Sequence, residues 1–307
     1  MWKLIVGVVT RRIAAMLIAM VFGSVAVAQD SVRIVTVNYP LQYFAERLAG
    51  EAAEVVFPVP ADVDPSFWRP NIADISMIQS ADLILLNGAG FATWIDRVSL
   101  PRSRLVNTTA GMSDSFIVTE SITHSHGDGG EHSHEGLASY LWLDLELAIA
   151  QAEAVAAALV SRRISAENEV EKHLATLRAE LQALDAQAKR NLADFGEVAI
   201  IATHPRYQYL AQRYGLNISS LEWEAGTRPN ANELEALGAL ADQTGARILI
   251  WEAAPPAQAL KETAALGLKN VVFEPMARTP SSGAFPNAFA AAVAELSSTA
   301  QSVAAGN

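Results

Sequence analysis

The sequence predicts an α/β protein with two lobes, each built on a parallel sheet, bridged by a long rigid helix and separated by a ligand cleft. Short apolar runs typical of strands alternate with helical patterns on both sides of a central segment, and such alternation is typical of parallel sheets. The central segment, Leu143 to about Phe195, has no Gly or Pro and is rich in the helix formers alanine, leucine and glutamate.

Residues 1–28 are predicted to be a secretory signal peptide. Basic residues up to Arg12 precede an apolar run, and Ala26-Val27-Ala28 fits the small-residue cleavage rule, so we expect the mature chain to start at Gln29. The run is shorter than the ~20 residues of a membrane-spanning helix. The sequence has no cysteine, which excludes disulfides, thiolate metal sites and a lipid-modified cysteine. We therefore expect a protein of the bacterial periplasm without a lipid anchor.

The chain is acidic, with a formal net charge of −11. This balance argues against nucleic-acid binding, which depends on a basic surface. Acidity also attracts cations over long range, although it equally favours solubility alone. Nucleic acid is therefore not expected as a partner.

The first lobe is predicted to cover residues 29–163. Its β-branched first strand is broken by Tyr39-Pro40, and its third strand is stopped by Asn87-Gly88. In chain order we expect a strand at 32–37, a helix at 41–49, a strand at 54–59, a loop at 64–70, a helix at 71–79 and a strand at 83–86.

The linking segment 164–195 is predicted to hold one helix from about 166 to 195, with Ser165 as its N-cap. Its apolar positions keep a spacing near 3.5 residues: Val170, Leu174, Leu177, Leu181, Leu184, Ala188 and Leu192. A coiled coil is one interpretation. A spine packed against two lobes is the simpler one, because there is only one such stripe.

The second lobe is predicted to cover residues 196–307. In chain order we expect a strand at 198–201, a helix at 207–214, a helix at 231–243, a strand at 247–251, a helix at 256–266, a strand at 270–273 and a helix at 286–297, followed by a frayed alanine-rich tail. Three side chains stand at or just past strand ends: His204, Glu252 and Glu274. Ligands of open α/β sheets bind outside such ends.

A histidine-rich tract occupies the predicted loop 123–135. It holds two His-x-His pairs around a Gly/Asp turn: His124, His126, His132 and His134. Imidazole is a good ligand for zinc, copper and nickel, so we expect this tract to bind zinc, at modest affinity because a flexible loop loses entropy on binding. The alternative is a solvated loop of low complexity without a metal role.

Several short motifs, taken in their order and spacing, resemble the solute-binding proteins of bacterial zinc and manganese ABC importers, the zinc-uptake component A and cluster A-I group. The motifs are Tyr39-Pro40-Leu41, the segment 59–65, Ser80-Ala81-Asp82-Leu83, Leu141-Trp142-Leu143-Asp144, His204-Pro205-Arg206-Tyr207 and Arg213-Tyr214-Gly215-Leu216. The resemblance covers nearly all of the mature chain. An acidic, His-rich loop before the Trp-Leu-Asp motif is a hallmark of the zinc-selective branch.

The resemblance implies a metal site of three histidines and one carboxylate at the cleft between the lobes. His204 matches the third histidine and Glu274 matches the carboxylate, but Ser66 and Tyr140 stand where the family has the first two histidines. Two ligands cannot complete a tetrahedral zinc shell. The loop can supply the missing ones, since His134 precedes Tyr140 by only six residues. We expect His204 and Glu274 to face each other, with Tyr140 and Ser66 lining the same cavity.

Three arginines also stand near the inferred cleft: Arg69, Arg206 and Arg278. A cation beside a metal site is unfavourable because like charges repel, whereas guanidinium forks suit carboxylates and phosphates. These arginines either bind an anionic cargo or pair with Asp64, Glu252 or Glu274. The sequence leaves both possibilities open.

The expected function is capture of zinc, or another divalent transition metal, as cargo in the periplasm and delivery to an inner-membrane ABC permease by a monomer. One alternative is an anionic or chelated-metal solute bound through Tyr140, Arg206 and Arg69; another is a periplasmic metal chaperone or sensor. A metal hydrolase using His204 and Glu274 is a third, but no His-Glu-x-x-His, Gly-x-Ser-x-Gly or phosphate-loop motif supports it. We expect that the protein is not an enzyme.

Overall fold

The computed structural model describes residues 31–119, 136–195 and 198–305. Contacts divide the chain into the unit Met1–Ser31, of which only Ser31 is described, and the unit Val32–Asn307, which holds every element below. The predicted signal peptide and the histidine-rich loop 123–135 lie outside the described residues.

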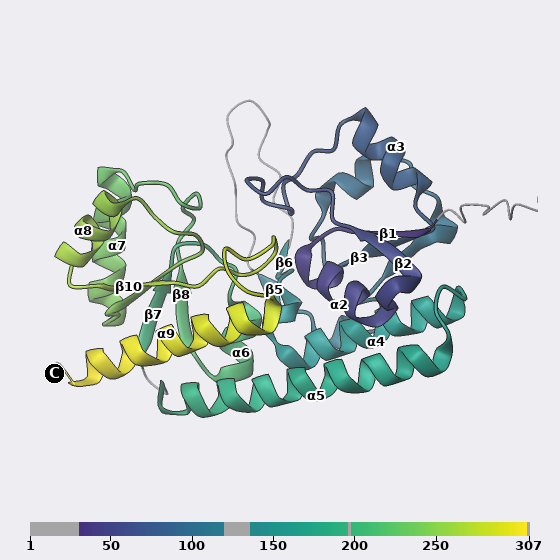
Figure 1. Cartoon of the computed structure of the whole chain (residues 1–307). Coiled ribbons are helices and arrows are strands. Elements are labelled where there is room, and N and C mark those ends of the chain that lie inside the picture. The colour runs from purple at the N-terminus through teal and green to yellow at the C-terminus, as the bar shows by residue number, and fades with distance from the viewer. Residues whose placement is uncertain (1–30, 120–135, 196–197, 306–307) are drawn as a thin grey trace, which may run out of the picture. The chain divides into compact units, whose positions relative to one another are not determined.

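The first sheet is parallel and has the strand order β2-β1-β3-β4 (Figure 1). Its strands are β1 (Val32–Thr36), β2 (Ala53–Val56), β3 (Leu83–Leu86) and β4 (Leu105–Asn107), and its helices are α2 (Tyr39–Ala49) and α3 (Ile72–Ser80). The Asn38 side chain caps α2 by accepting a hydrogen bond from the backbone N–H of Leu41. Helix α2 therefore starts two residues earlier than the sequence pattern predicts.

The second sheet is also parallel, in the order β10-β9-β7-β8. Its strands are β7 (Ala199–Ala202), β8 (Asn217–Ser220), β9 (Ile248–Trp251) and β10 (Lys269–Val272), and its helices are α6 (Gln208–Tyr214), α7 (Ala231–Thr244) and α8 (Ala257–Ala265). The predicted α/β fold class with two parallel sheets is confirmed.

Three long helices run beside the sheets: α4 (Leu145–Ser161), α5 (Glu167–Leu192) and α9 (Phe285–Ala305). Helix α5 is unbroken and packs against α2 and α4 from the first lobe and against α6 and α9 from the second (Figure 1). Its buried stripe comprises Val170, Leu177, Leu181, Leu184, Ala188 and Leu192. Since one face serves both lobes, α5 is a shared spine.

Two predictions about helix ends are wrong. Ala166, not Ser165, is the N-cap of α5, and no side chain caps it; Glu167 and Glu169 in the first turn provide the favourable negative charge instead. The tail after residue 297 is not frayed, because α9 continues to Ala305. Ala300 is buried and Val303 packs on the core, so tertiary contact extends this helix.

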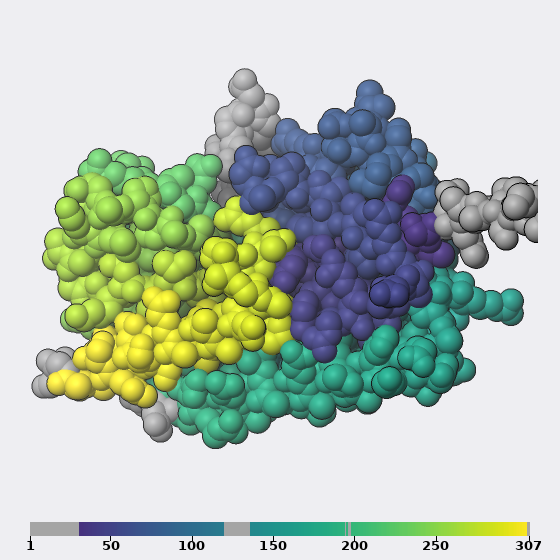
Figure 2. Space-filling model, in the orientation of Figure 1, coloured from purple at the N-terminus to yellow at the C-terminus, as the bar shows by residue number. Residues whose placement is uncertain are grey.

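The lobes also meet through hydrogen-bond and ring contacts. The indole N–H of Trp142 donates to the carbonyl oxygen of Pro275 at 2.7 Å. The ring of Phe285, at the start of α9, lies 5.9 Å from Tyr43 and 5.8 Å from Phe44, centroid to centroid. Figure 2 shows the C-terminal segment (yellow) against the N-terminal one (purple). These contacts connect the two lobes in addition to α5.

Short elements complete the described chain. They are the antiparallel pair β5 (Val118–Thr119) and β6 (Gly136–Leu137), and the 3₁₀ turns Gly50–Ala52, Thr93–Arg97, Arg102–Arg104, Ser113–Ser115, Leu141–Leu143 and Ala193–Phe195. The pair β5–β6 flanks residues 120–135, which lie outside the described chain, and β6 ends at Leu137, three residues before Tyr140. Of the helices described, none has both the length and the apolar character needed to cross a membrane.

Candidate functional site

The carboxyl ends of the central strands carry the polar side chains of the cleft. In the second sheet the strand order reverses between β7 and β9; His204 follows β7 and Glu252 directly follows β9. In the first sheet the reversal lies between β1 and β3, where the Asn38 amide donates to Oδ1 of Asn87 at 3.0 Å. Such reversal points are where open α/β sheets bind ligands.

His204 and Glu252 form the pair at the second-lobe reversal point. The Nδ1 atom of His204 lies 3.5 Å from Oε2 of Glu252, at the outer limit of a hydrogen bond, and finds no closer partner among the described residues. Burial raises the pKa of Glu252, but His204 and the charge of Arg206 outweigh it, and the pKa lies below its usual value. Glu252 is therefore a buried carboxylate that stays ionised.

Arg206 joins the two lobes across the cleft. Its Nη2 donates to Oδ2 of Asp64 in the first lobe at 2.8 Å, and its Nε donates to Oε2 of Glu252 at 3.4 Å. The residue is only 8% exposed. The surrounding negative groups outweigh burial and raise the pKa of Arg206 further. One guanidinium thus neutralises one carboxylate from each lobe.

Aromatic rings enclose the same guanidinium. Its carbon lies 4.7 Å from the ring centre of Tyr140 and 5.5 Å from that of Phe67, both within cation–π range. Tyr140 is 3% exposed, with its ring against Phe91 and Trp142. Burial strongly raises the pKa of the Tyr140 hydroxyl, so with the cleft in this state the phenol is protonated.

Ser66 orients the first-lobe carboxylate. Its hydroxyl and its backbone N–H both donate to Oδ1 of Asp64, at 2.6 and 2.8 Å. The other oxygen of Asp64 is left to face Arg206. Ser66 therefore acts on the cleft through Asp64.

The arrangement amounts to a buried cation position. One carboxylate from each lobe and the imidazole of His204 surround a single positive charge, that of Arg206. Removing that charge would leave Glu252 buried and unpaired, which is strongly unfavourable.

The remaining predicted residues make other contacts. Glu274 accepts a hydrogen bond from the backbone N–H of Ser281 at 3.0 Å, and within the described chain it shares no hydrogen bond or ion pair with His204. Arg278 donates to the carbonyl oxygen of Ala61 at 3.5 Å. Arg69 lines another cavity. A metal-ligand role for Glu274 stays a prediction.

No three His, Cys, Asp or Glu side chains converge to hold a metal ion within residues 31–119, 136–195 and 198–305. His124, His126, His132 and His134 lie outside those residues. The proposal that the loop completes a metal shell stays a prediction for the same reason.

Sequence reasoning named Asp64 and Glu252 as possible arginine partners and placed Glu252 at a strand end. The structure pairs both carboxylates with Arg206. The strand order explains why Glu252 lies beside His204, because β9 is the direct neighbour of β7.

Two parallel α/β lobes with facing polar reversal points, spanned by one helix, define a two-lobe solute-binding protein. The chain belongs to the family of the periplasmic zinc-uptake complex component A, whose family model matches residues 34–299.

Relatives with established names agree with this assignment. The zinc-binding lipoprotein AdcA of Streptococcus pneumoniae serotype 4 is 28% identical over 219 residues, 68% of this chain and 43% of the relative; the chain spans less than half of that protein's length. The high-affinity zinc uptake system protein ZnuA of Bacillus subtilis is 25% identical over 242 residues, 75% of this chain and 73% of the relative. The crystal structure of the Zn(II)-bound ZnuA-like domain of Streptococcus pneumoniae AdcA has a TM-score of 0.73 at 21% identity, covering 88% of this chain and 98% of that one.

Proposed function

We propose that this protein is the extracytoplasmic solute-binding component of an ABC importer and that its cargo is zinc or another divalent transition metal. The observation that carries the proposal is the buried cation position between the lobes. Asp64, Glu252 and His204 carry oxygen and nitrogen donors of the kind that zinc accepts. With Arg206 between them, these three described side chains do not converge on one point, so a metal requires them to move closer together. Family membership supports the same cargo class.

Capture of a cation requires Arg206 to leave its two carboxylates. A guanidinium and a divalent ion cannot share a cleft of low dielectric, because their charges repel. The side chain therefore swings out as the ion enters, and the ion takes over neutralisation of Asp64 and Glu252. The empty protein thereby avoids exposing two bare carboxylates to each other.

The histidine tract is proposed as an accessory zinc site. The strands β5 and β6 flank the tract in the chain, and the backbone N–H of Ile117, just before β5, donates a hydrogen bond to the hydroxyl of Tyr209, a residue of the second lobe, at 3.2 Å. The described residues before the tract therefore contact the second lobe. The role that we propose for its histidines is to collect zinc and to add donors to the cleft.

A second candidate is an anionic solute or a chelated metal held in the same cleft. Ser66 and Tyr140 in place of two family histidines favour it. The ion pairs of Arg206 argue against an anionic cargo, because its guanidinium is already bound to Asp64 and Glu252. We therefore rank the bare cation first.

The proposal includes a partner and a compartment. The partner is an ABC permease of the inner membrane, met by a monomeric protein in the periplasm after removal of residues 1–28, without a lipid anchor. No catalytic step is assigned to the cleft, whose side chains neutralise one another without an activated nucleophile.

The test is zinc titration by calorimetry of the mature chain and four variants: deletion of residues 123–135, His204→Ala, the two combined, and His173→Ala as a control. His173 lies on α5, with Nδ1 3.2 Å from the carbonyl oxygen of Leu48. We expect the deletion to lower the zinc stoichiometry. We expect His204→Ala to weaken the cleft site about tenfold or more, ~1.4 kcal/mol, with or without the loop.

The control and the contrary outcomes are distinct. His173→Ala should leave both zinc sites unchanged. Unchanged stoichiometry after the deletion would remove the tract from the proposal. Intact metal binding in His204→Ala, together with loss of binding to an anionic solute in Arg206→Ala, would replace metal capture by the second candidate.

A further inference from the structure

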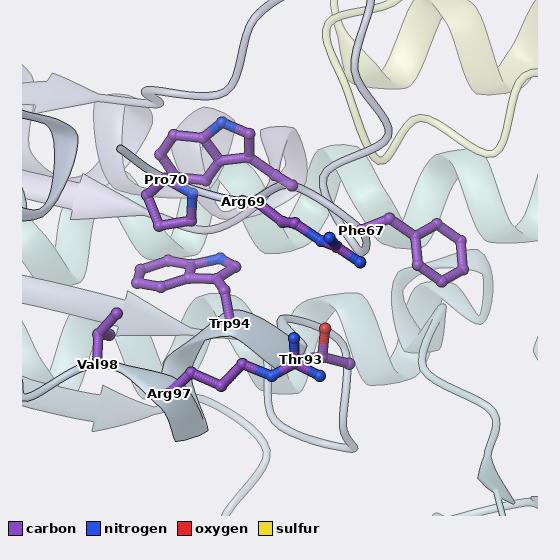
Figure 3. A pocket seen from close by; sticks show the side chains of 8 residues that line it. Phe67, Arg69, Pro70, Thr93, Trp94, Arg97 and Val98 are labelled. Atoms are coloured by element: carbon purple, nitrogen blue, oxygen red, sulfur yellow. The ribbon is translucent and has the colours of Figure 1, made fainter. Parts of the chain in front are cut away.

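A cavity of about 410 Å³ lies in the first lobe beside the cleft (Figure 3). It is lined by Phe67, Trp68, Arg69, Pro70, Thr93, Trp94, Arg97 and Val98. Its volume is in the range of sites for small molecules, roughly 300 to 1,000 Å³. No step of the proposed metal capture uses it.

One end of the cavity is apolar and rigid. Trp68 and Trp94 are 6% and 5% exposed, and their rings meet edge to face at 5.6 Å and 81°. Figure 3 shows Trp94, Pro70 and Val98 at the same end of the cavity. Indole side chains fixed by each other offer a planar apolar surface at little entropic cost.

The other end is cationic. Figure 3 shows the guanidinium groups of Arg69 and Arg97 reaching toward the Phe67 side, with Thr93 beside them. Within the described chain neither guanidinium has a hydrogen bond, an ion pair or a cation–π contact. Both arginines are exposed.

Arg69 and Arg97 share this unpaired state with other arginines of the described chain, among them Arg190, and differ in it from the ion-paired ones. Six others each form an ion pair with a carboxylate: Arg33, Arg47, Arg178, Arg206, Arg213 and Arg228. In a protein of net charge −11, two cations that line one cavity without a carboxylate beside them leave room for an acceptor from outside.

We propose that this cavity binds a small organic anion with a planar apolar body, of the aromatic carboxylate class. Guanidinium forks match carboxylates, and two of them from different segments suit a ligand with two acceptor groups. The indole surface takes the apolar body, which an inorganic anion lacks. The proposal is independent of metal capture.

The cavity adjoins the cleft through one side chain. Phe67 lines the cavity and also lies 5.5 Å from the guanidinium carbon of Arg206. Binding is therefore measured on metal-stripped protein, and zinc binding is measured separately on each variant. Loss of one activity without the other separates failure of this proposal from failure of metal capture.

The probe is isophthalate, a benzene ring with two carboxylates. Its binding to the full chain is measured by calorimetry and by tryptophan fluorescence. We expect a Kd below about 1 mM, raised about tenfold or more by Arg69→Gln and by Arg97→Gln. Arg190→Gln, an exposed arginine on α5, is the matched control and should leave the Kd unchanged. Thermal unfolding of each variant checks that the fold is kept.

Two comparison ligands test the parts of the proposal. Isophthalamide, the neutral isostere, and inorganic phosphate, the bare anion, should each bind at least about tenfold more weakly than isophthalate. Equal binding of isophthalamide would overturn the cationic role, and equal binding of phosphate would overturn the role of the apolar end. Isophthalate binding absent up to about 10 mM, or unaffected by both arginine variants, would overturn the site.

Discussion

In the cation site that we propose, Arg206 occupies with its own side chain the position of the cargo. It is held by Asp64 at 2.8 Å and by Glu252 at 3.4 Å, under the rings of Tyr140 and Phe67. A buried charge pair contributes little net stability when intact, but breaking it is costly. Arg206 therefore lowers the cation affinity of the cleft and stabilises the empty protein.

Replacing Arg206 with glutamine should separate these quantities. Without the competing charge, Asp64 and Glu252 are free to hold a cation, so we expect zinc affinity of the cleft to rise about tenfold. The metal-free variant should lose about 3 kcal/mol of unfolding free energy, because buried Glu252 is left unpaired. Calorimetry and urea unfolding measure the two effects.

The half-exposed pair Arg178–Glu153 provides the control for that variant. Arg178→Gln should change both quantities little, since surface ion pairs contribute little. Weaker zinc binding in Arg206→Gln would mean that the arginine positions the cargo rather than competing with it.

The candidate site was predictable only in part. His204 and its motif identify the cleft without knowledge of the structure. Asp64 and Arg206 are 142 residues apart in the chain, and nothing local in the sequence brings them together. The position of Glu252 beside His204 depends on strand order, which short apolar strands do not encode.

At the scale of elements, α5 is the part of the fold that both lobes share. Leu177 and Leu181 are fully buried in its stripe, against helices from the two sides. A cavity there loosens packing for the first and the second sheet together. We therefore expect the protein to unfold as one cooperative unit rather than lobe by lobe.

Leu181→Ala tests this role. Removing a fully buried leucine side chain should cost about 2 to 5 kcal/mol of unfolding free energy, seen as a lower urea midpoint in a single transition. The exposed neighbour Gln182 is the control, and Gln182→Ala should stay within about 0.5 kcal/mol of the parent. A cost below about 1 kcal/mol, or two separate transitions, would show that α5 is not a common spine.

Long elements were easier to predict from the sequence than short ones. Alpha-helix α5 follows directly from the absence of Gly and Pro, because no local signal interrupts it. The strands β4 and β8 were missed, since Leu105–Asn107 and Asn217–Ser220 are short, lie at sheet edges and carry polar residues. The length of α9 depends on its packing against α5 and β10, which propensity does not reveal.

At the scale of the whole molecule, charged side chains connect helices of both lobes. Arg213 on α6 pairs with Asp185 on α5 at 2.7 Å and with Glu146 on α4 at 2.6 Å. Burial raises the pKa of Asp185, but hydrogen bonds from Arg213 and Lys189 lower it by more; Arg213 also lowers the pKa of Glu146. Both carboxylates are thus more acidic in the folded protein.

Acid should therefore weaken the fold through Arg213. A carboxylate whose folded pKa is depressed stabilises the protein above the unfolded pKa, about 4, and loses that contribution as pH falls through the folded pKa. We expect the urea midpoint to drop as pH falls below about 4, and to drop less in Arg213→Gln. Burial raises the pKa of Asp144, so this carboxyl group contributes to the pH dependence of stability in the opposite sense. An equal acid response in the variant would contradict the assignment.

In the proposed mechanism, the ion pairs of Arg206 also limit the rate at which cargo enters the cleft. An incoming ion meets a cleft whose donors are already engaged, so encounter alone is not sufficient and the side chain must first rotate away. At low metal the frequency of collisions limits uptake. At high metal the rate levels off at the opening rate of the bridge, as expected when a minor conformation is selected before binding. At low concentration the metal would then be taken up in proportion to its supply. A sudden excess would be taken up no faster than the rate at which Arg206 separates from its two carboxylates.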